Sequence, residues 1–77
     1  MKSLVIKLNS IVEVKKFVNI ISHYTGEFKV SEGKYTVNGK SIMGVFSLDL
    51  KNNLSLRINS EENLSMLIHE LKPYIVA

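Results

Sequence analysis

An antiparallel hairpin is predicted by residues 27–37, which read EFKVSEGKYTV. Phe28 and Val30 alternate with polar neighbours, so one side of this strand can face a hydrophobic core. Residues 32–34 supply a turn, and residues 35–37 read as the returning strand. This hairpin predicts an antiparallel sheet, against which the other segments of the chain can be placed.

The segments before the hairpin predict a strand followed by a helix. Apolar and less apolar residues alternate over positions 4–9, which is typical of a strand. Ser10 and Glu13 fit a capping box, in which the serine hydroxyl accepts from the Glu13 amide and the carboxylate reaches back. Gly26 is placed to end the helix. Apolar residues recur between them at helical spacing: Ile11, Val14, Phe17, Val18, Ile21 and Tyr24.

The segments after the hairpin predict a helix, a strand and another helix. Residues 41–48 are dense in apolar side chains, which favours a short buried helix, and alternation over residues 54–58 predicts a fourth strand. Ser60, followed by two acids, predicts the start of a last helix that Pro73 ends near residues 71–72. The order β-α-β-β-α-β-α predicts an α+β open-faced sandwich, with a four-stranded antiparallel sheet and helices on one face.

Length and composition exclude several kinds of protein. A chain of 77 residues fits a single domain over positions 1–77. It has no cysteine, which rules out disulfides, thiolate metal sites and a cysteine nucleophile. Lysine interrupts the apolar start too early for a signal peptide and no stretch approaches a membrane span, so we expect a cytoplasmic protein. The net charge of +3 permits an acidic partner without requiring one.

Three patterns that often mark a site do not lead to one here. Gly33 and Gly39 are separated by one residue more than the glycines of a phosphate-binding P-loop. His23 and His69 have no suitable partners at helical spacing, so we expect surface histidines, no metal and no cofactor. The lysines and the arginine are dispersed and the aromatic residues fall on expected core faces, so nucleic-acid binding is not favoured.

A second stretch carries a more specific signal. Residues 37–48 read VNGKSIMGVFSL, and the part from Lys40 to Val45, followed by Ser47 and Leu48, resembles the regulatory-serine motif of HPr. HPr is the phosphocarrier of the bacterial phosphoenolpyruvate:sugar phosphotransferase system. The predicted order of elements and the length of the chain also resemble that family. The resemblance implies a single HPr-like domain that is not an enzyme and that works with other phosphotransferase-system proteins.

The family's phosphorylated histidine has no counterpart in this resemblance. An ungapped match from Ser41 backwards places Ser10 at the histidine position, Val12 at the arginine position and Glu13 at the proline position. A phosphohistidine requires an imidazole nucleophile, with amides and a cation to stabilise the phosphoryl oxygens. Valine supplies no cation and Glu13 adds a repelling charge, so we expect that histidine phosphotransfer is lost and that no residue here is catalytic.

Ser41 and its neighbours remain as candidate site residues. In the family, this serine is phosphorylated by HPr kinase, and the phosphorylated form binds a catabolite-control regulator. By analogy Lys40, Ile42, Met43 and Phe46 would dock a partner. A helix N-cap would also explain Ser41, and core packing would equally explain Ile42 and Phe46, whereas Met43 favours docking.

The sequence thus favours a regulatory protein-binding module in carbon catabolite regulation, switched at Ser41. Two alternatives stay open, namely an unregulated structural or adaptor module and, less favoured, a small nucleic-acid binder. Asp49 stands where the family usually has a small residue, which would weaken recognition by the usual partners.

Overall fold

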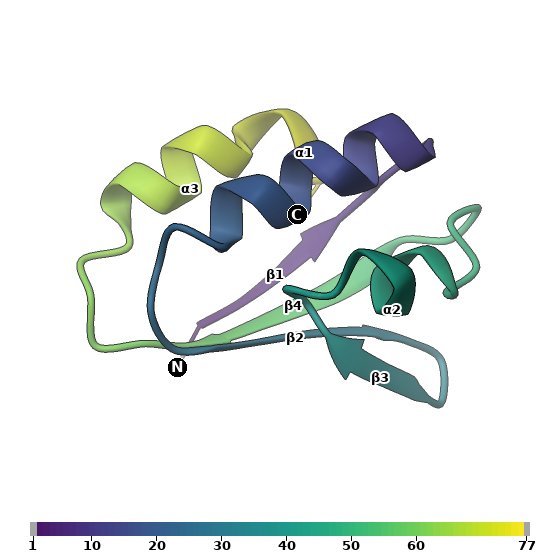
Figure 1. The fold of residues 1–77 in the computed structure, drawn as a ribbon, viewed down its shortest axis with the longest axis horizontal. Coiled ribbons are helices and arrows are strands. Elements are labelled where there is room, and N and C mark those ends of the chain that lie inside the picture. The colour runs from purple at the N-terminus through teal and green to yellow at the C-terminus, as the bar shows by residue number, and fades with distance from the viewer. Residues whose placement is uncertain (1, 77) are drawn as a thin grey trace.

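The four strands form one antiparallel sheet in the computed structural model, which describes residues 2–76. The strands are β1 (Lys2–Ile6), β2 (Glu27–Glu32), β3 (Tyr35–Asn38) and β4 (Leu54–Asn59). The helices are α1 (Ile11–Ile21), α2 (Ile42–Phe46) and α3 (Ser65–Leu71), and a 3-10 turn, η1 (Lys72–Tyr74), follows the last of them. This order confirms the α+β open-faced sandwich predicted from the sequence (Figure 1).

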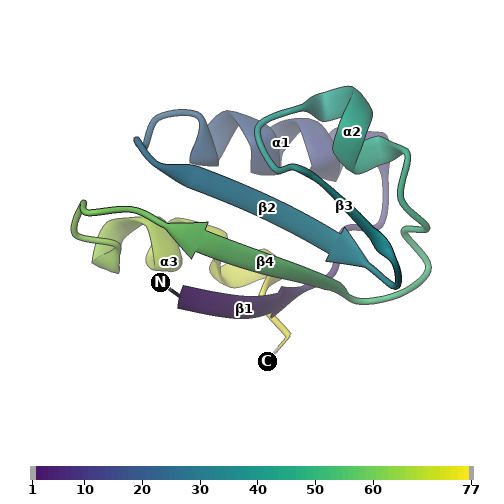
Figure 2. The same ribbon diagram turned by 90° about the horizontal axis from the view of Figure 1, so that it is seen from below.

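The order of strands across the sheet is β1-β4-β2-β3, so β4 lies between two strands that come much earlier in the chain. All three helices cover one face of this sheet and the other face is open (Figure 2). At the β1 edge the C-terminal segment continues the pairing, because the Val76 amide donates to the Val5 carbonyl at 2.8 Å. The free edge of the sheet is therefore β3.

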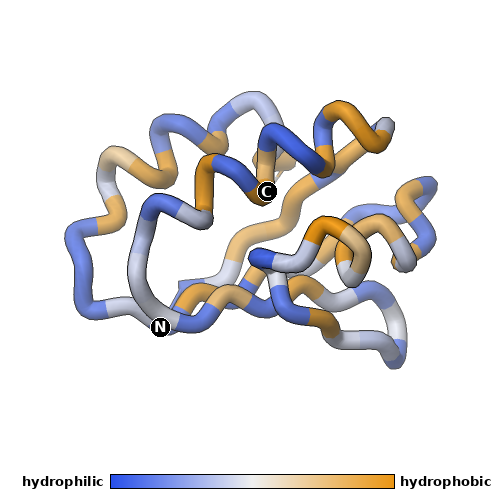
Figure 3. Tube along the Cα trace, in the orientation of Figure 1, coloured by the Kyte–Doolittle hydropathy of each residue, from blue (hydrophilic) through white to orange (hydrophobic). Residues whose placement is uncertain are grey.

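The core lies between the sheet and the helices. Alternate residues of β4 are buried, namely Leu54, Leu56 and Ile58, and they meet the buried stripe of α1. That stripe consists of Val14, Phe17, Val18 and Ile21. Burying each such side chain stabilises the fold by roughly 1.5–3 kcal/mol. Figure 3 shows apolar positions interspersed with polar ones along the strands and helices, as the alternation and helical spacing predicted.

The last helix begins later than the sequence predicted. Ser60 does not cap a helix; its hydroxyl accepts from the Glu62 amide at 3.1 Å within a turn. The Glu62 carboxylate instead binds the amide and hydroxyl of Thr25, beyond the end of α1. The helix starts at Ser65, after a turn in which Asn63 accepts from the Ser65 amide at 2.9 Å. The contact between Glu62 and Thr25 therefore holds this segment in a turn, although its sequence is typical of a helix start.

Two further expectations, about the end of α1 and about the length and burial of α2, were wrong. Helix α1 ends at Ile21 with Ser22 as its C-cap, so Gly26 does not end it. Gly26 lies in the connection to β2 with φ of +113°, where a Cβ atom would come within 2.5 Å of the Asn59 carbonyl oxygen. Helix α2 covers residues 42–46 and buries Val45 alone, so it is shorter and more exposed than the buried helix predicted.

Candidate functional site

Ser41 is the N-cap of helix α2. Its backbone is extended, with φ of −101° and ψ of 114°, and its hydroxyl accepts a hydrogen bond from the Gly44 amide at 3.0 Å. Its carbonyl accepts the first helical hydrogen bond, from the Val45 amide, also at 3.0 Å. The serine thus satisfies an amide that would otherwise have no partner in so short a helix.

The space beside the Ser41 hydroxyl depends on Gly44. A Cβ atom at Gly44 would lie 3.2 Å from the Ser41 oxygen and 3.3 Å from the Val37 Cβ atom, which is tighter than usual packing. No acidic residue lies in the first turn of α2. A larger group on the Ser41 oxygen would therefore meet little steric crowding from position 44 and no carboxylate from this turn.

Three apolar side chains project from the outer side of α2. Met43 is 81% exposed, Phe46 49% and Ile42 39%, whereas Val45 on the inner side is fully buried. We call Ile42, Met43 and Phe46 the α2 patch. Their spacing places them on one face of a helical turn. Helix α2 is thus held by one buried residue and presents three apolar residues to solvent, so core packing accounts for none of the three fully.

Lys40 is turned away from solvent at its charged end. Its ammonium group donates to the Tyr24 carbonyl at 2.6 Å and lies 5.0 Å from the centre of the Phe28 ring. A part-buried cation in such a position joins the start of α2 to the end of α1 and to the sheet. Lys40 is next to the α2 patch in the sequence. Its ammonium group, however, contacts the Tyr24 carbonyl and the Phe28 ring within the fold.

The start of α1 also carries a serine cap, as the sequence predicted. The Ser10 hydroxyl accepts from the Glu13 amide at 3.2 Å, and the Glu13 carboxylate accepts from the Asn9 amide at 2.8 Å. The carboxylate therefore reaches one residue further back than the usual capping box. These two bonds engage the Asn9 and Glu13 amides, and they hold beside the helix start a carboxylate that repels other anions.

Val12 is an exposed apolar residue that the sequence did not single out as part of a surface. It follows the α1 cap and is 55% exposed. Its spacing from Val14 and Phe17 places it on the side of α1 away from the core. Helices α1 and α2 pack against each other, and Figures 1 and 2 both place α2 beside the first half of α1. Its place in the helix pattern, one position off the buried stripe, could have identified it.

The histidines lie outside any such arrangement. His23 is exposed after the end of α1, with its Nδ1 atom 2.7 Å from the Asn19 carbonyl oxygen, and His69 is exposed on α3. Within residues 2–76, no group of three or more histidine, aspartate or glutamate side chains is arranged to hold a metal ion. Over the same residues, no helix has both the length and the apolar character that a membrane crossing requires.

Comparison with known protein families identifies the family of this chain. The family described as "PTS HPr component phosphorylation site" matches residues 13–72, which is more than half of the chain. The chain belongs to the HPr family. Members of this family are phosphocarriers of the phosphotransferase system rather than catalysts, and they interact with other proteins of that system. No curated protein matches the chain significantly.

The extent of the family match divides the candidate residues into two groups. Lys40, Ser41 and the α2 patch lie inside the matched residues 13–72, whereas Ser10 precedes them. The cap at Ser41 and its neighbouring patch thus occur in the part of the chain that carries the family likeness. The cap at Ser10 occurs in the part where the likeness does not extend.

Proposed function

We propose that this HPr-family chain is a regulatory protein-binding module, controlled by phosphorylation of Ser41, that does not carry phosphate on a histidine. The partner would be a kinase of the HPr kinase type and then a catabolite-control regulator or another phosphotransferase-system protein. The carrying observation is the arrangement around α2, where a capping serine is followed directly by three exposed apolar side chains.

The local geometry supports modification at Ser41. In the transfer, the Ser41 oxygen would bond to the γ-phosphorus of ATP, the hydroxyl would lose its proton and ADP would leave. The phosphate would then lie near the Gly44 amide, which already donates to this oxygen. Phosphate oxygens are strong acceptors and are stabilised by amides at a helix start. A phosphate oxygen would thus take the place of the hydroxyl as acceptor for the Gly44 amide, and the helix would keep its cap.

The same arrangement supports docking on the α2 patch. Interfaces are built around buried aromatic and flexible apolar side chains with a polar or charged rim. Phe46 and Met43 supply the aromatic and the flexible side chain, and a phosphate on Ser41 would add a charged group at one end. A partner with apolar contacts and a cation would therefore distinguish the phosphorylated form from the unmodified form.

Loss of histidine phosphotransfer rests on the residues at the start of α1. Counted back from Ser41 without gaps, Ser10 would take the family's histidine position, and its hydroxyl accepts from the Glu13 amide as a helix cap. His23 and His69 do not lie at the first turn of a helix, where amides would stabilise a phosphoryl group. Incubation with phosphoenolpyruvate and enzyme I should leave this chain unlabelled while authentic HPr takes up phosphate. Acid-labile phosphate on this chain would contradict the proposal.

The kinase experiment tests the regulatory part. Incubation with HPr kinase and ATP should place one phosphate on Ser41, mapped by mass spectrometry, while S41A stays unlabelled and S10A is labelled like the unmodified chain. S41A should be compared by circular dichroism to show that it is folded. If authentic HPr is labelled and this chain is not, the unregulated adaptor is the better description. Labelling elsewhere than Ser41 would also contradict the proposed switch.

A further inference from the structure

The open face of the sheet carries mostly polar side chains, in three rows across the strands. The middle row runs through paired positions on all four strands, namely Ser3, Arg57, Lys29 and Asn38. On one side of it Asn59 pairs with Glu27, and on the other lie Val5, Ser55, Ser31 and Thr36. Neighbouring rows on one face are separated by roughly 6.6 Å along the strands. The face therefore has a basic row between an acceptor row and a hydroxyl row.

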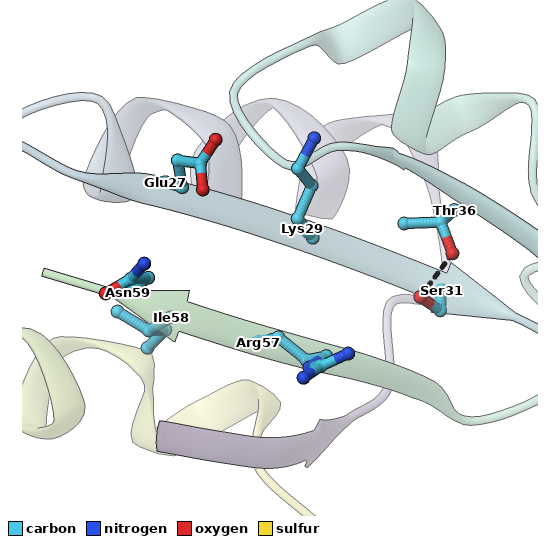
Figure 4. A pocket seen from close by; sticks show the side chains of 7 residues that line it. All are labelled: Glu27, Lys29, Ser31, Thr36, Arg57, Ile58 and Asn59. Atoms are coloured by element: carbon cyan, nitrogen blue, oxygen red, sulfur yellow. Dashed lines mark hydrogen bonds between the residues drawn. The ribbon is translucent and has the colours of Figure 1, made fainter. Parts of the chain in front are cut away.

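The basic row places two cations on adjacent strands in direct register. Lys29 on β2 is paired with Arg57 on β4, and Figure 4 shows both side chains projecting from the same side of the sheet. Like charges at directly paired positions repel one another and weaken a sheet. Arg57 is also engaged within the chain, and its guanidinium group carries five N–H donors in a fixed plane, so a ligand would share this side chain with its existing partner.

Hydroxyl groups flank the two cations. The Ser31 and Thr36 hydroxyls are 2.9 Å apart and hydrogen-bonded to each other. Whichever of them donates, the other keeps its own proton and can donate to a ligand. On the opposite side, Glu27 offers a carboxylate that accepts hydrogen bonds, and Asn59 offers an amide that can both accept and donate.

These residues surround a hollow on the open face. A pocket of about 260 Å³ is lined by Glu27, Lys29, Ser31, Thr36, Arg57, Ile58 and Asn59. This volume is below the range of drug-sized ligand sites, which begins at about 300 Å³, so it suits a small molecule. A solvated antiparallel face is ordinarily polar, but here two paired cations, two hydroxyl groups and a carboxylate line the same hollow.

We propose that this hollow, which we call the open-face pocket, binds a small phosphate monoester that carries hydroxyl groups. The phosphate would lie on Lys29 and Arg57 and accept from the Ser31–Thr36 hydroxyl pair. The hydroxyl-bearing end would extend toward Glu27, which accepts from hydroxyls and repels a second anionic group. The residues that line the pocket lie in front of the sheet in Figure 4, with the helices behind it, so the proposal is independent of Ser41 and of the α2 patch.

The test is a titration of the uniformly ¹⁵N-labelled chain with glycerol 3-phosphate at constant ionic strength, followed by amide chemical shifts. Saturable shifts are expected on β2 and β4 around Lys29 and Arg57, with weaker binding of inorganic phosphate and none of glycerol. K29Q and R57Q should each weaken binding about tenfold, the usual effect of losing one charge-assisted contact. K34Q removes a lysine from the β2–β3 turn and should bind within about twofold of the unmodified chain.

Folding of each variant is read from the same spectra, since dispersed shifts outside the sheet face show an intact core. If R57Q does not fold, R57K can replace it as a folded variant that keeps the positive charge. The test of the proposal then rests on K29Q. Glycerol 3-phosphate that binds K29Q and K34Q equally well would overturn the proposal. So would shifts that never saturate, or shifts spread over the lysines of both faces, because they indicate only an ion atmosphere.

Discussion

Helices α1 and α2 both begin at a serine whose hydroxyl accepts from the amide three residues further on. Behind the Ser10 cap, α1 buries four apolar residues, and Glu13 closes its first turn. Behind the Ser41 cap, α2 buries Val45 alone and presents the α2 patch to solvent. The same kind of serine cap thus begins one helix that is packed into the core and another helix that is mostly exposed to solvent.

This difference teaches that a serine cap by itself does not mark a functional site. What distinguishes Ser41 is its surroundings, since Gly44 leaves room beside its hydroxyl and no carboxylate lies in the first turn. At Ser10 a carboxylate occupies the helix start instead. The predictions below test this contrast, beginning with the largest expected effect.

The largest contrast is expected between two phenylalanines. Phe17 on α1 is fully buried, whereas Phe46 on α2 is 49% exposed. F17A should lower the free energy of unfolding by about 3–5 kcal/mol, because it leaves a cavity in the core. F46A should lower it by less than about 1 kcal/mol, as measured by urea denaturation. Equal losses in the two variants would show that α2 is part of the core after all.

A smaller effect is expected from Lys40, which joins the two helices. K40M keeps much of the side-chain length but removes the hydrogen bond to the Tyr24 carbonyl and the contact with the Phe28 ring. It should lower the free energy of unfolding by about 1–2 kcal/mol, whereas K34M in the exposed β2–β3 turn should change it little. If K40M leaves stability unchanged but weakens partner binding, Lys40 acts in docking alone.

The two caps should contribute equally to stability and differ in modification. S10A and S41A should each lower the free energy of unfolding by about 1 kcal/mol, because each removes a side-chain acceptor from a helix start. Denaturant unfolding of the two variants measures this. The contrast between the helices would then lie in the kinase reaction, where S41A alone should lose the label. A much larger loss of stability in S41A would instead indicate a structural serine.

The smallest effect concerns the end of α1 and its contact with α3. The Tyr24 hydroxyl donates to the Glu70 carboxylate at 2.6 Å, and this hydrogen bond raises the pKa of Tyr24 above its ordinary value of 10.0. The stabilisation it gives is present below the ordinary pKa and is lost as the pH rises through the higher pKa of the folded chain.

Absorbance at 295 nm against pH would measure this shift. E70Q should bring the titration of Tyr24 back toward its ordinary value, because the negative charge that opposes ionisation is removed. Y24F identifies which of the tyrosine transitions belongs to this residue. Titration of Tyr24 that is identical in E70Q and in the unmodified chain would contradict the contact.

Much of the fold could be read from local patterns. Alternation of apolar residues identified β1, β2 and β4, the turn at residues 32–34 identified β3 as the returning strand, and the capping box identified the start of α1, because all these signals come from residues close together in the chain. The start of α3 could not be found in this way. Glu62, which looks like a first-turn acid, binds Thr25 in the connection between α1 and β2, and such a contact has no local signature.

The candidate sites divide in the same manner. The cap role of Ser41 and the exposure of Met43 follow from the local sequence and from the shortness of α2. The pairing of Lys29 with Arg57 depends on which strands are neighbours, and the sequence order gives no direct sign that β4 lies beside β2. Lys29 and Arg57, which lie far apart along the chain, are therefore brought side by side only by the topology of the sheet.

The position of β4 also bears on how the chain acquires its structure. Strands β1 and β2 are not hydrogen-bonded to each other, because β4 lies between them. Strand β4 begins only at Leu54. A chain that ends before Leu54 would hold a hairpin and a strand without the element that joins them into one sheet. Such pairing between distant segments slows folding and makes it all-or-none. During synthesis, then, the open-face pocket, which includes Arg57, Ile58 and Asn59 of β4, would not be complete until almost the whole domain has left the ribosome.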